Sequence, residues 1–164
     1  MHVLEGVFSN LSFRQAVLLY PVATALHVLE EWPGFPRWAR RFAAPAYSDR
    51  EYLVTHVVTV LVAVVAAGTL RAFPDPRLVW VFIAFVFGPA VFCNALFHAG
   101  ASLASRAYCP GVRTGLLLYL PLSCALVALA LREGLLSGRS LLVALCLAAL
   151  CHAAEVGHNV FKRW

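Results

Sequence analysis

The chain alternates between long apolar runs and short polar connections. Runs of predominantly apolar residues, each near the roughly 20 residues that cross a bilayer, occupy about 13–31, 52–70, 78–99, 115–131 and 141–160. None of these runs has the polar face that a helix of a soluble bundle shows. The pattern predicts an all-α membrane protein, a single domain over 1–164 built as a five-transmembrane-helix bundle.

Two further features modify this bundle. Pro21 interrupts the first run, and Pro89 and Pro121 lie within the third and fourth runs. Proline is tolerated in a membrane helix when neighbouring helices satisfy the freed carbonyl groups. The longest connection follows the first run and contains Pro-Arg-Trp-Ala-Arg-Arg-Phe at 36–42. Arginine and aromatic residues at this spacing predict a short helix lying on the lipid headgroups.

Composition and charge agree with a protein surrounded by lipid. Hydrophobic residues make up 62% and charged residues 13%, against about 45–50% and about 25% in soluble domains. The N-terminus lacks the basic region of a cleavable signal, so we expect the first run to be a permanent span. The five cysteines show no CxxC spacing and four lie in apolar runs, which predicts buried apolar side chains rather than disulfides.

The net charge of +5 is carried by the connections, which favours orientation signals over a nucleic-acid surface. One side of the predicted bundle has eight basic residues: Arg37, Arg40, Arg41, Arg50, Arg106, Arg113, Lys162 and Arg163. The other has five: Arg14, Arg71, Arg77, Arg132 and Arg139. Because basic residues accumulate on the cytoplasmic side, this predicts an outside N-terminus and a cytoplasmic C-terminus.

Histidines and acids inside the runs gather toward one side. Odd-numbered spans end where even-numbered spans begin, so the more basic side receives His27, Glu30, Glu31, His56, Asn94, His98, His152, Glu155, His158 and Asn159. The far halves of the spans contain no His, Asp or Glu. Ionisable groups in hydrocarbon are costly unless they are paired or bound. We therefore expect these side chains to form one cluster.

Spacing within each helix supports the cluster, because residues three or four apart share a helical face. Glu155 and His158 also repeat the Glu-x-x-His pattern of two-metal carboxylate bundles. Each group has a simpler alternative. His27 with Glu30 and Glu31 can be a helix end in the headgroups, and His56 can make a structural hydrogen bond. Asn94 and His98 can be a packing pair between helices.

The chain resembles the HXXEE-domain family of small bacterial integral membrane proteins. The resemblance rests on His27-Val28-Leu29-Glu30-Glu31, and it extends to Asn94-x-x-x-His98, Tyr108-x-Pro-Gly-x-x-Thr114 and His158-Asn159. It implies a location in a bacterial cytoplasmic membrane and a functional role for the motif, but no particular reaction.

The donor set exceeds the four ligands of a tetrahedral ion and predicts two divalent ions, with iron favoured and zinc possible. Glu30, Glu31 and Glu155 are the candidate bridges and catalytic carboxylates. The terminal ligands would be His27, His56, His98, His152 and His158. Asn94 and Asn159 would support the ligands. Tyr108 lies in a turn and is a candidate lid or proton donor.

The preferred hypothesis is a metal-dependent membrane enzyme acting on a lipophilic substrate. Oxidation with a redox partner is slightly favoured over hydrolysis, in which one glutamate would be the general base. A second hypothesis is a carrier or channel for protons or metal ions. The apolar far half of the bundle favours a one-sided pocket instead. A third is metal-free acid/base isomerisation or cyclisation of an isoprenoid.

Overall fold

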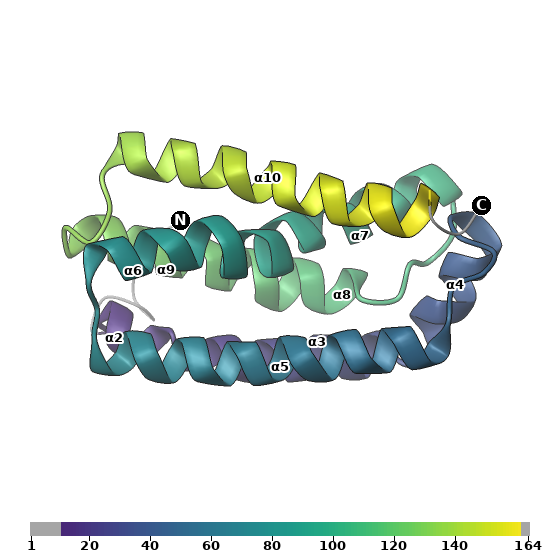
Figure 1. The fold of residues 1–164 in the computed structure, drawn as a ribbon, viewed down its shortest axis with the longest axis horizontal. Coiled ribbons are helices and arrows are strands. Elements are labelled where there is room, and N and C mark those ends of the chain that lie inside the picture. The colour runs from purple at the N-terminus through teal and green to yellow at the C-terminus, as the bar shows by residue number, and fades with distance from the viewer. Residues whose placement is uncertain (1–10, 162–164) are drawn as a thin grey trace.

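The computed structural model describes residues 11–161, and every regular element in that range is helical, as predicted. The elements, labelled in Figure 1, are α2 (Phe13–Ala16), α3 (Leu19–Glu31), α4 (Gly34–Phe42), α5 (Asp49–Ala72), α6 (Pro76–Phe82), the π-helix η1 (Ile83–Cys93), α7 (Asn94–Ser105), α8 (Val112–Thr114), the π-helix η2 (Gly115–Tyr119), α9 (Leu120–Arg132) and α10 (Gly138–Phe161).

Four continuous helical stretches of the described chain are long and apolar enough to cross a membrane. They are Asp49–Ala72, Pro76–Ser105, Val112–Arg132 and Gly138–Phe161. These correspond to the second to fifth predicted spans and are compatible with a membrane protein. The prediction of five such helices is corrected to four.

The first apolar run is not one helix. It is divided into α2, with 4 residues, and α3, with 13 residues. Pro21 has no N–H to donate to the carbonyl of Val17, and its ring crowds that carbonyl. The chain tightens there instead, with Tyr20 N donating to Val17 O at 3.1 Å. The interruption predicted at Pro21 is present, but it leaves no helix in 13–31 long enough to count as one of five spans, although the polar end of that run is helical.

The helices lie in three layers (Figure 1). α10 forms one outer layer and packs on η1; α3 and α5 pack together on the opposite side. The stretches α6–η1–α7 and α8–η2–α9 run between them. At Gly88 of η1, a Cβ atom would lie 2.6 Å from Ala148 Cβ of α10. Small residues thus allow the close approach that stabilises helix pairs in lipid.

Both interior prolines coincide with π-helical turns. Pro89 lies within η1, and Pro121 follows η2 by two residues. Proline cannot donate the usual helical hydrogen bond, and the wider i→i+5 turn accommodates the change without ending the helix. The sequence prediction that these prolines are tolerated inside long helices is confirmed.

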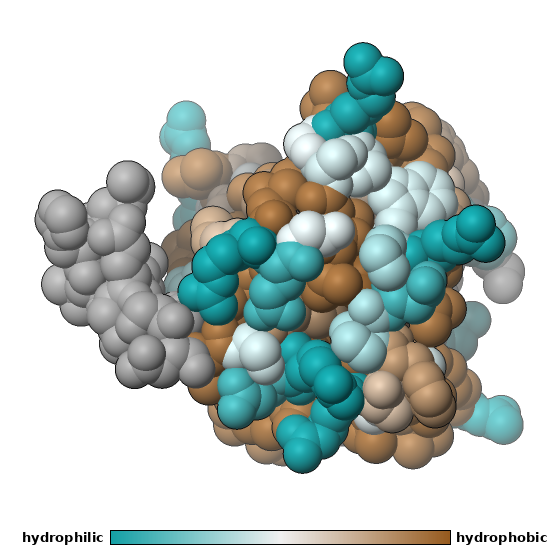
Figure 2. Space-filling view, turned by 90° about the vertical axis from the view of Figure 1, so that its left-hand side faces the viewer, coloured by the Kyte–Doolittle hydropathy of each residue, from teal (hydrophilic) through white to brown (hydrophobic). Residues whose placement is uncertain are grey.

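The sides of the bundle are apolar and its end is hydrophilic. Figure 2 views the end that holds α2, where hydrophilic side chains are spread over the face among apolar ones. Exposed apolar residues on the sides include Leu61, Val65 and Leu150. Cys124 and Cys146 are also exposed, so the expectation that they are buried is wrong. A lipid environment accounts for this inversion of the usual pattern.

Helix α4 is the predicted short helix after the first run. Trp38 and Ala39 are buried on one face, while Arg37 and Arg41 are exposed on the other. Arg40 Nη1 lies 2.6 Å from Asp49 Oδ1 at the start of α5. This pair and the buried face hold α4 against the bundle end where α7 and α10 also finish (Figure 1).

Candidate metal centre

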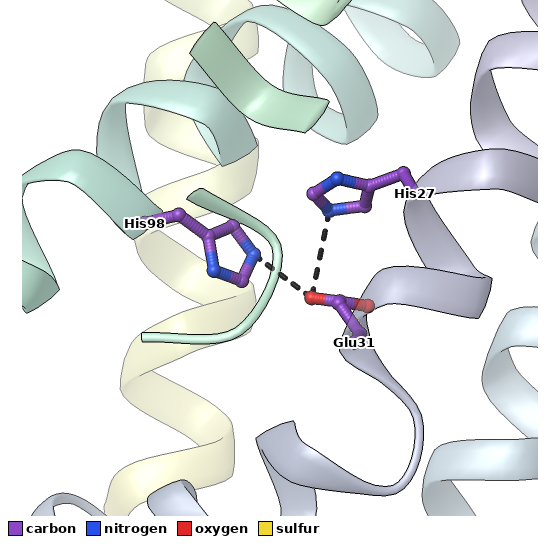
Figure 3. Close-up of side chains that lie close together, drawn as sticks. All are labelled: His27, Glu31 and His98. Atoms are coloured by element: carbon purple, nitrogen blue, oxygen red, sulfur yellow. Dashed lines mark ion pairs between the residues drawn. The ribbon is translucent and has the colours of Figure 1, made fainter. Parts of the chain in front are cut away.

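Glu31, the last residue of α3, is surrounded by imidazole rings. Its side chain is buried, with the residue 1% exposed. Oε1 lies 2.9 Å from His98 Nε2 and 3.5 Å from His27 Nε2, as Figure 3 shows. Oε2 lies 3.1 Å from His56 Nε2 and accepts a hydrogen bond of 2.8 Å from the Tyr52 hydroxyl. One carboxylate thus joins α3, α5 and α7.

Helical spacing brings these side chains together in pairs. His27 and Glu31 are four residues apart on α3, and Tyr52 and His56 are four apart on α5, so each pair shares a face. The Tyr52 and His56 rings stack with centroids 3.8 Å apart. His98 reaches the same point from α7, where it is fully buried. Local helix geometry therefore supplies two pairs, and tertiary packing adds His98.

The proton of His27 can be placed from its neighbours. His27 Nδ1 lies 2.7 Å from Thr114 Oγ1. The Thr114 hydroxyl in turn faces a Glu30 carboxylate oxygen and the Gly111 carbonyl oxygen. Both of these oxygens accept, so the hydroxyl donates to one of them and accepts from His27 Nδ1–H. In neutral His27, Nε2 then carries the lone pair, and it faces Glu31.

The other two rings are arranged in the same way. His56 Nδ1 lies 2.7 Å from the carbonyl oxygen of Tyr52, which only accepts. His98 Nδ1 lies 3.3 Å from Cys109 Sγ, while that sulfur faces the Pro110 carbonyl at 3.8 Å as donor. Both Nδ1 atoms therefore carry hydrogen in the neutral rings, and both Nε2 lone pairs point toward Glu31.

Three lone pairs directed at a carboxylate repel it unless a metal ion lies among them or the imidazoles are protonated. His27 Nε2 and His98 Nε2 are buried, and within the described residues neither has a partner with hydrogen-bond geometry. Metal-binding histidines show this arrangement, because a hydrogen bond from the second ring nitrogen fixes the tautomer. Ligand atoms of His27, Glu31 and His98 lie within 4.8 Å of one another. The donor set fits a divalent transition metal.

Glu30 points to residues 106–114, the turn after α7 together with the short helix α8, which we name the capping loop. Its carboxylate accepts from Thr114 N at 2.6 Å and Arg113 N at 3.1 Å. The Tyr108 hydroxyl donates to the same carboxylate. These bonds fasten both ends of the turn to α3. Because its oxygens are already engaged, we place Glu30 outside the ligand set.

Gly111 brings the capping loop directly against the cluster. Its φ of +99° favours glycine. A Cβ at this position would lie 2.8 Å from His98 Cε1, 2.9 Å from His27 Cε1 and 3.0 Å from Glu31 Cγ. Only a backbone without a side chain fits there. The loop therefore closes one side of the cluster, and a loop segment passes beside these residues in Figure 3.

Two ionisable residues of the capping loop have altered acidity. Burial raises the pKa of the Cys109 thiol to about 12, and the nearby Glu31 and Glu30 carboxylates add to the shift. Desolvation and the hydrogen bond to Glu30 raise the pKa of Tyr108 to about 12. Both side chains are therefore neutral at ordinary pH, in agreement with Cys109 donating toward Pro110 and Tyr108 donating to Glu30.

The same motif identifies the family. Residues 18–126, more than half of the chain, match the family described as "Protein of unknown function with HXXEE motif". The chain belongs to the HXXEE family. It is also 28% identical over 131 residues to "Uncharacterized protein YrkK" of Bacillus subtilis (strain 168), an alignment covering 77% of this chain and 82% of the relative. No solved structure matches the chain significantly.

A cavity of about 220 Å³ adjoins the cluster of His27, Glu31, His56 and His98. His27, Glu31 and His56 contribute to its wall, and further polar wall residues are Thr24, Asn94, Tyr119, His152, Glu155 and Asn159. Exposed residues such as Thr55 and Glu155 also line it. The cavity therefore extends from the buried cluster to the outer surface between α5 and α10.

The predicted site residues separate into three groups. His27, Glu31, His56 and His98 meet directly, as described above. Four others line the adjoining cavity: Asn94, His152, Glu155 and Asn159. The remainder lie elsewhere: Glu30 and Tyr108 fasten the capping loop, and His158 is exposed and is not among the described residues that line the cavity.

Sequence reasoning gave no site role to Tyr52, Cys109, Gly111 and Thr114. Tyr52 had a usable signal, because it lies four residues before His56 and so shares its helical face. Gly111 and Thr114 belong to the turn Tyr108-x-Pro-Gly-x-x-Thr114, but their contacts with His27 and His98 depend on tertiary packing. Cys109 was placed in this turn without a role, yet its sulfur faces His98.

Proposed function

We propose that the protein is a membrane enzyme that holds one divalent metal ion through His27, Glu31 and His98 and acts on a lipophilic substrate in the adjoining cavity. The observation that carries this proposal is the convergence of imidazole Nε2 acceptors on a buried carboxylate, with the Nδ1 protons directed outward. A +2 ion would turn mutual repulsion into coordination.

The geometry favours one ion over the two expected from sequence. A carboxylate bridge between two ions would require a second carboxylate beside Glu31, and Glu30 is hydrogen-bonded to the capping loop. Glu155 is exposed on the cavity wall and His158 is exposed outside it. Among the described residues, one group of three ligands converges. His56, on the other Glu31 oxygen, is a fourth ligand or orients the carboxylate.

Two imidazoles and one carboxylate suit non-haem iron(II), and they also suit catalytic zinc. Such a set leaves coordination positions for small ligands. Iron would supply oxidation chemistry, with dioxygen and a redox partner as co-reactants. Zinc hydrolysis needs a general base near the ion. Glu155 lines the cavity, but it is exposed and lies outside the group of converging ligands. Oxidation therefore remains the preferred reaction class.

The cavity wall also indicates which hydrogen-bonding groups the substrate carries. Asn94 Oδ1 and His152 Nε2 are buried acceptors on its wall, and neither has a hydrogen-bond partner within the described residues. The other His152 nitrogen faces the Pro89 carbonyl, which makes Nε2 an acceptor in the neutral ring. A lipophilic molecule carrying a hydroxyl group would donate to one of these atoms, and one carrying an amino group would donate to both.

A membrane location would give this cavity access to lipid. We place the chain in a bacterial cytoplasmic membrane, with α4 at the headgroups and the metal end of the bundle on the cytoplasmic side. Support comes from the four apolar stretches and from the eight basic residues expected on that side. In this arrangement α2 and α3 together would cross the remaining thickness.

A conduit for protons or metal ions is less well supported. A pathway needs polar groups along its length, whereas the core beyond the cluster is formed by residues such as Tyr20, Phe87 and Leu126. Metal-free acid/base catalysis on an isoprenoid would replace the ion by protons on the imidazoles. It predicts that purified protein holds no stoichiometric metal.

Metal analysis of the full chain, purified in detergent without chelators, tests the proposal. We expect about one iron or zinc per chain, and visible d–d bands after Co²⁺ loading that report nitrogen and oxygen ligands. His98→Ala should lose both signals. His158→Ala is the matched control, because His158 is exposed on α10 and should retain metal. Metal-free wild-type protein with an intact fold would favour proton chemistry and reject the metal site.

A further inference from the structure

A second pocket lies between α4 and the capping loop. Its volume is about 400 Å³, and its wall contains Arg37 and Arg41 of α4 and Arg106 from the loop. Aromatic side chains complete the wall: Trp38, Phe42 and Tyr108. We name it the basic pocket. It is distinct from the cavity beside Glu31, although Trp38 lines both.

The three arginines of the basic pocket have no acidic partners. All three are exposed, and within residues 11–161 none forms an ion pair. Arg40, on the same helix, shows the contrast because it pairs with Asp49 at 2.6 Å. Arg41 lies instead over the Phe42 ring, 5.0 Å from its centroid. The pocket thus concentrates positive charge that the described chain does not neutralise.

Other polar groups in the wall add no negative charge that would oppose an anion. Trp38 is 9% exposed, and its indole Nε1–H is buried without a partner among the described residues. The Tyr108 hydroxyl donates to Glu30, and Ser105 Oγ donates to backbone carbonyls. Neither hydroxyl therefore brings negative charge into the pocket. Guanidinium and indole groups are donors only. Their natural ligand is a group rich in acceptor oxygens.

We propose that the basic pocket binds the phosphate group of an anionic phospholipid. Arginine presents a planar fork of donors that matches phosphate oxygens. Basic pockets at the cytoplasmic end of membrane helices suit such headgroups. Tryptophan and tyrosine favour the same interfacial depth. The lipid would hold α4 against the capping loop, and so the site does not depend on metal or catalysis.

Native mass spectrometry of the full chain, released from nanodiscs, measures which lipids remain bound. Wild-type protein should retain phosphatidylglycerol in preference to phosphatidylcholine. The triple variant Arg37→Gln/Arg41→Gln/Arg106→Gln should bind phosphatidylglycerol at least about tenfold more weakly, because each basic residue contributes to attraction. Arg71→Gln/Arg77→Gln/Arg139→Gln removes equal charge from the opposite end and should bind as wild type does.

A lysine variant and competition with inorganic phosphate identify the source of the phosphate and control for misfolding. Replacing the three pocket arginines by lysine keeps the charge and should restore part of the binding. If inorganic phosphate displaces phosphatidylglycerol at millimolar concentration, the pocket serves a soluble phosphate and the lipid assignment fails. Equal retention of both lipids by wild type, or unchanged retention by a folded triple glutamine variant, would overturn the proposal. Metal content should be the same in all variants.

Discussion

Glu30 and Glu31 are adjacent in the chain, yet their carboxylates serve opposite parts of the structure. Glu31 faces the interior, where His27, His56 and His98 converge on it. Glu30 faces the capping loop and accepts from backbone N–H groups. Successive residues of an α-helix point about 100° apart. The last turn of α3 therefore contacts both the interior imidazoles and the capping loop. The two glutamates of the motif therefore have separable roles.

Glutamine substitutions should separate these roles. Glu31→Gln removes the anion opposite the imidazoles, and we expect metal affinity to fall at least about tenfold. Glu30→Gln weakens the charge-assisted bonds to Arg113 N and Thr114 N. We expect it to lower the free energy of unfolding by about 1–3 kcal/mol, with a smaller effect on metal. Metal content and thermal unfolding in detergent measure the two effects.

The measurement also has an outcome that contradicts this division. If Glu30→Gln loses metal as completely as Glu31→Gln while it keeps its stability, Glu30 is a ligand. The capping-loop contacts would then rearrange on metal binding. The exposed Glu51→Gln, at the start of α5, serves as a control for loss of one carboxylate.

Sequence patterns predicted the bundle because apolar length is a local property. Four of the five runs became helices long enough to span a membrane. The first run, 13–31, is divided at Pro21, where the missing N–H and the crowded Val17 carbonyl separate α2 from α3. That outcome was visible in the residues, since a proline near the middle of a 19-residue run removes a hydrogen bond. Whether the helix continues past such a proline depends on whether neighbouring helices satisfy the freed carbonyl group.

The site was predicted in part for the same reason. Because successive spans run in opposite directions, the sequence correctly predicted that His27, His56 and His98 lie at one end of the bundle. Helical spacing did not reveal that Glu30 turns toward the capping loop, because its partners Arg113 and Thr114 are more than 80 residues away. Such contacts depend on how the loop folds over α3, and no local pattern encodes that.

Cys109 should resist alkylation in the folded protein. Its side chain is fully buried, and burial raises its thiol pKa to about 12. A raised pKa favours the neutral thiol, so at pH 8 only roughly one molecule in ten thousand carries the reactive thiolate. Reactivity should increase as pH rises toward 12 or when the protein unfolds. Mass spectrometry after N-ethylmaleimide treatment measures this, and rapid labelling of Cys109 at pH 8 would contradict the buried position.

The topology can be tested with single cysteines in an otherwise cysteine-free chain. Ser48 precedes α5 and Ser137 precedes α10 at the opposite end of the bundle (Figure 1). In intact cells, a membrane-impermeant maleimide should label Ser137→Cys from outside and leave Ser48→Cys unlabelled. Ser12→Cys, before α2, should behave like Ser137→Cys if α2 and α3 together cross the membrane. Labelling of both Ser48→Cys and Ser137→Cys from one side would reject the arrangement.

Gly111→Ala should damage the metal centre more than any other single methyl group added to a loop. The new Cβ would lie 2.8 Å from His98 Cε1 and 2.9 Å from His27 Cε1, and alanine also disfavours the φ of +99°. The capping loop must then move away from the two imidazoles, and we expect at least about tenfold weaker metal binding. Gly134→Ala provides the matched control, because its φ is +70° but no described atom lies within 4 Å of the added Cβ. It carries the backbone strain alone, about 1–2 kcal/mol, and should keep its metal. Equal metal affinity in the two variants would mean that the capping loop does not hold the imidazoles in place.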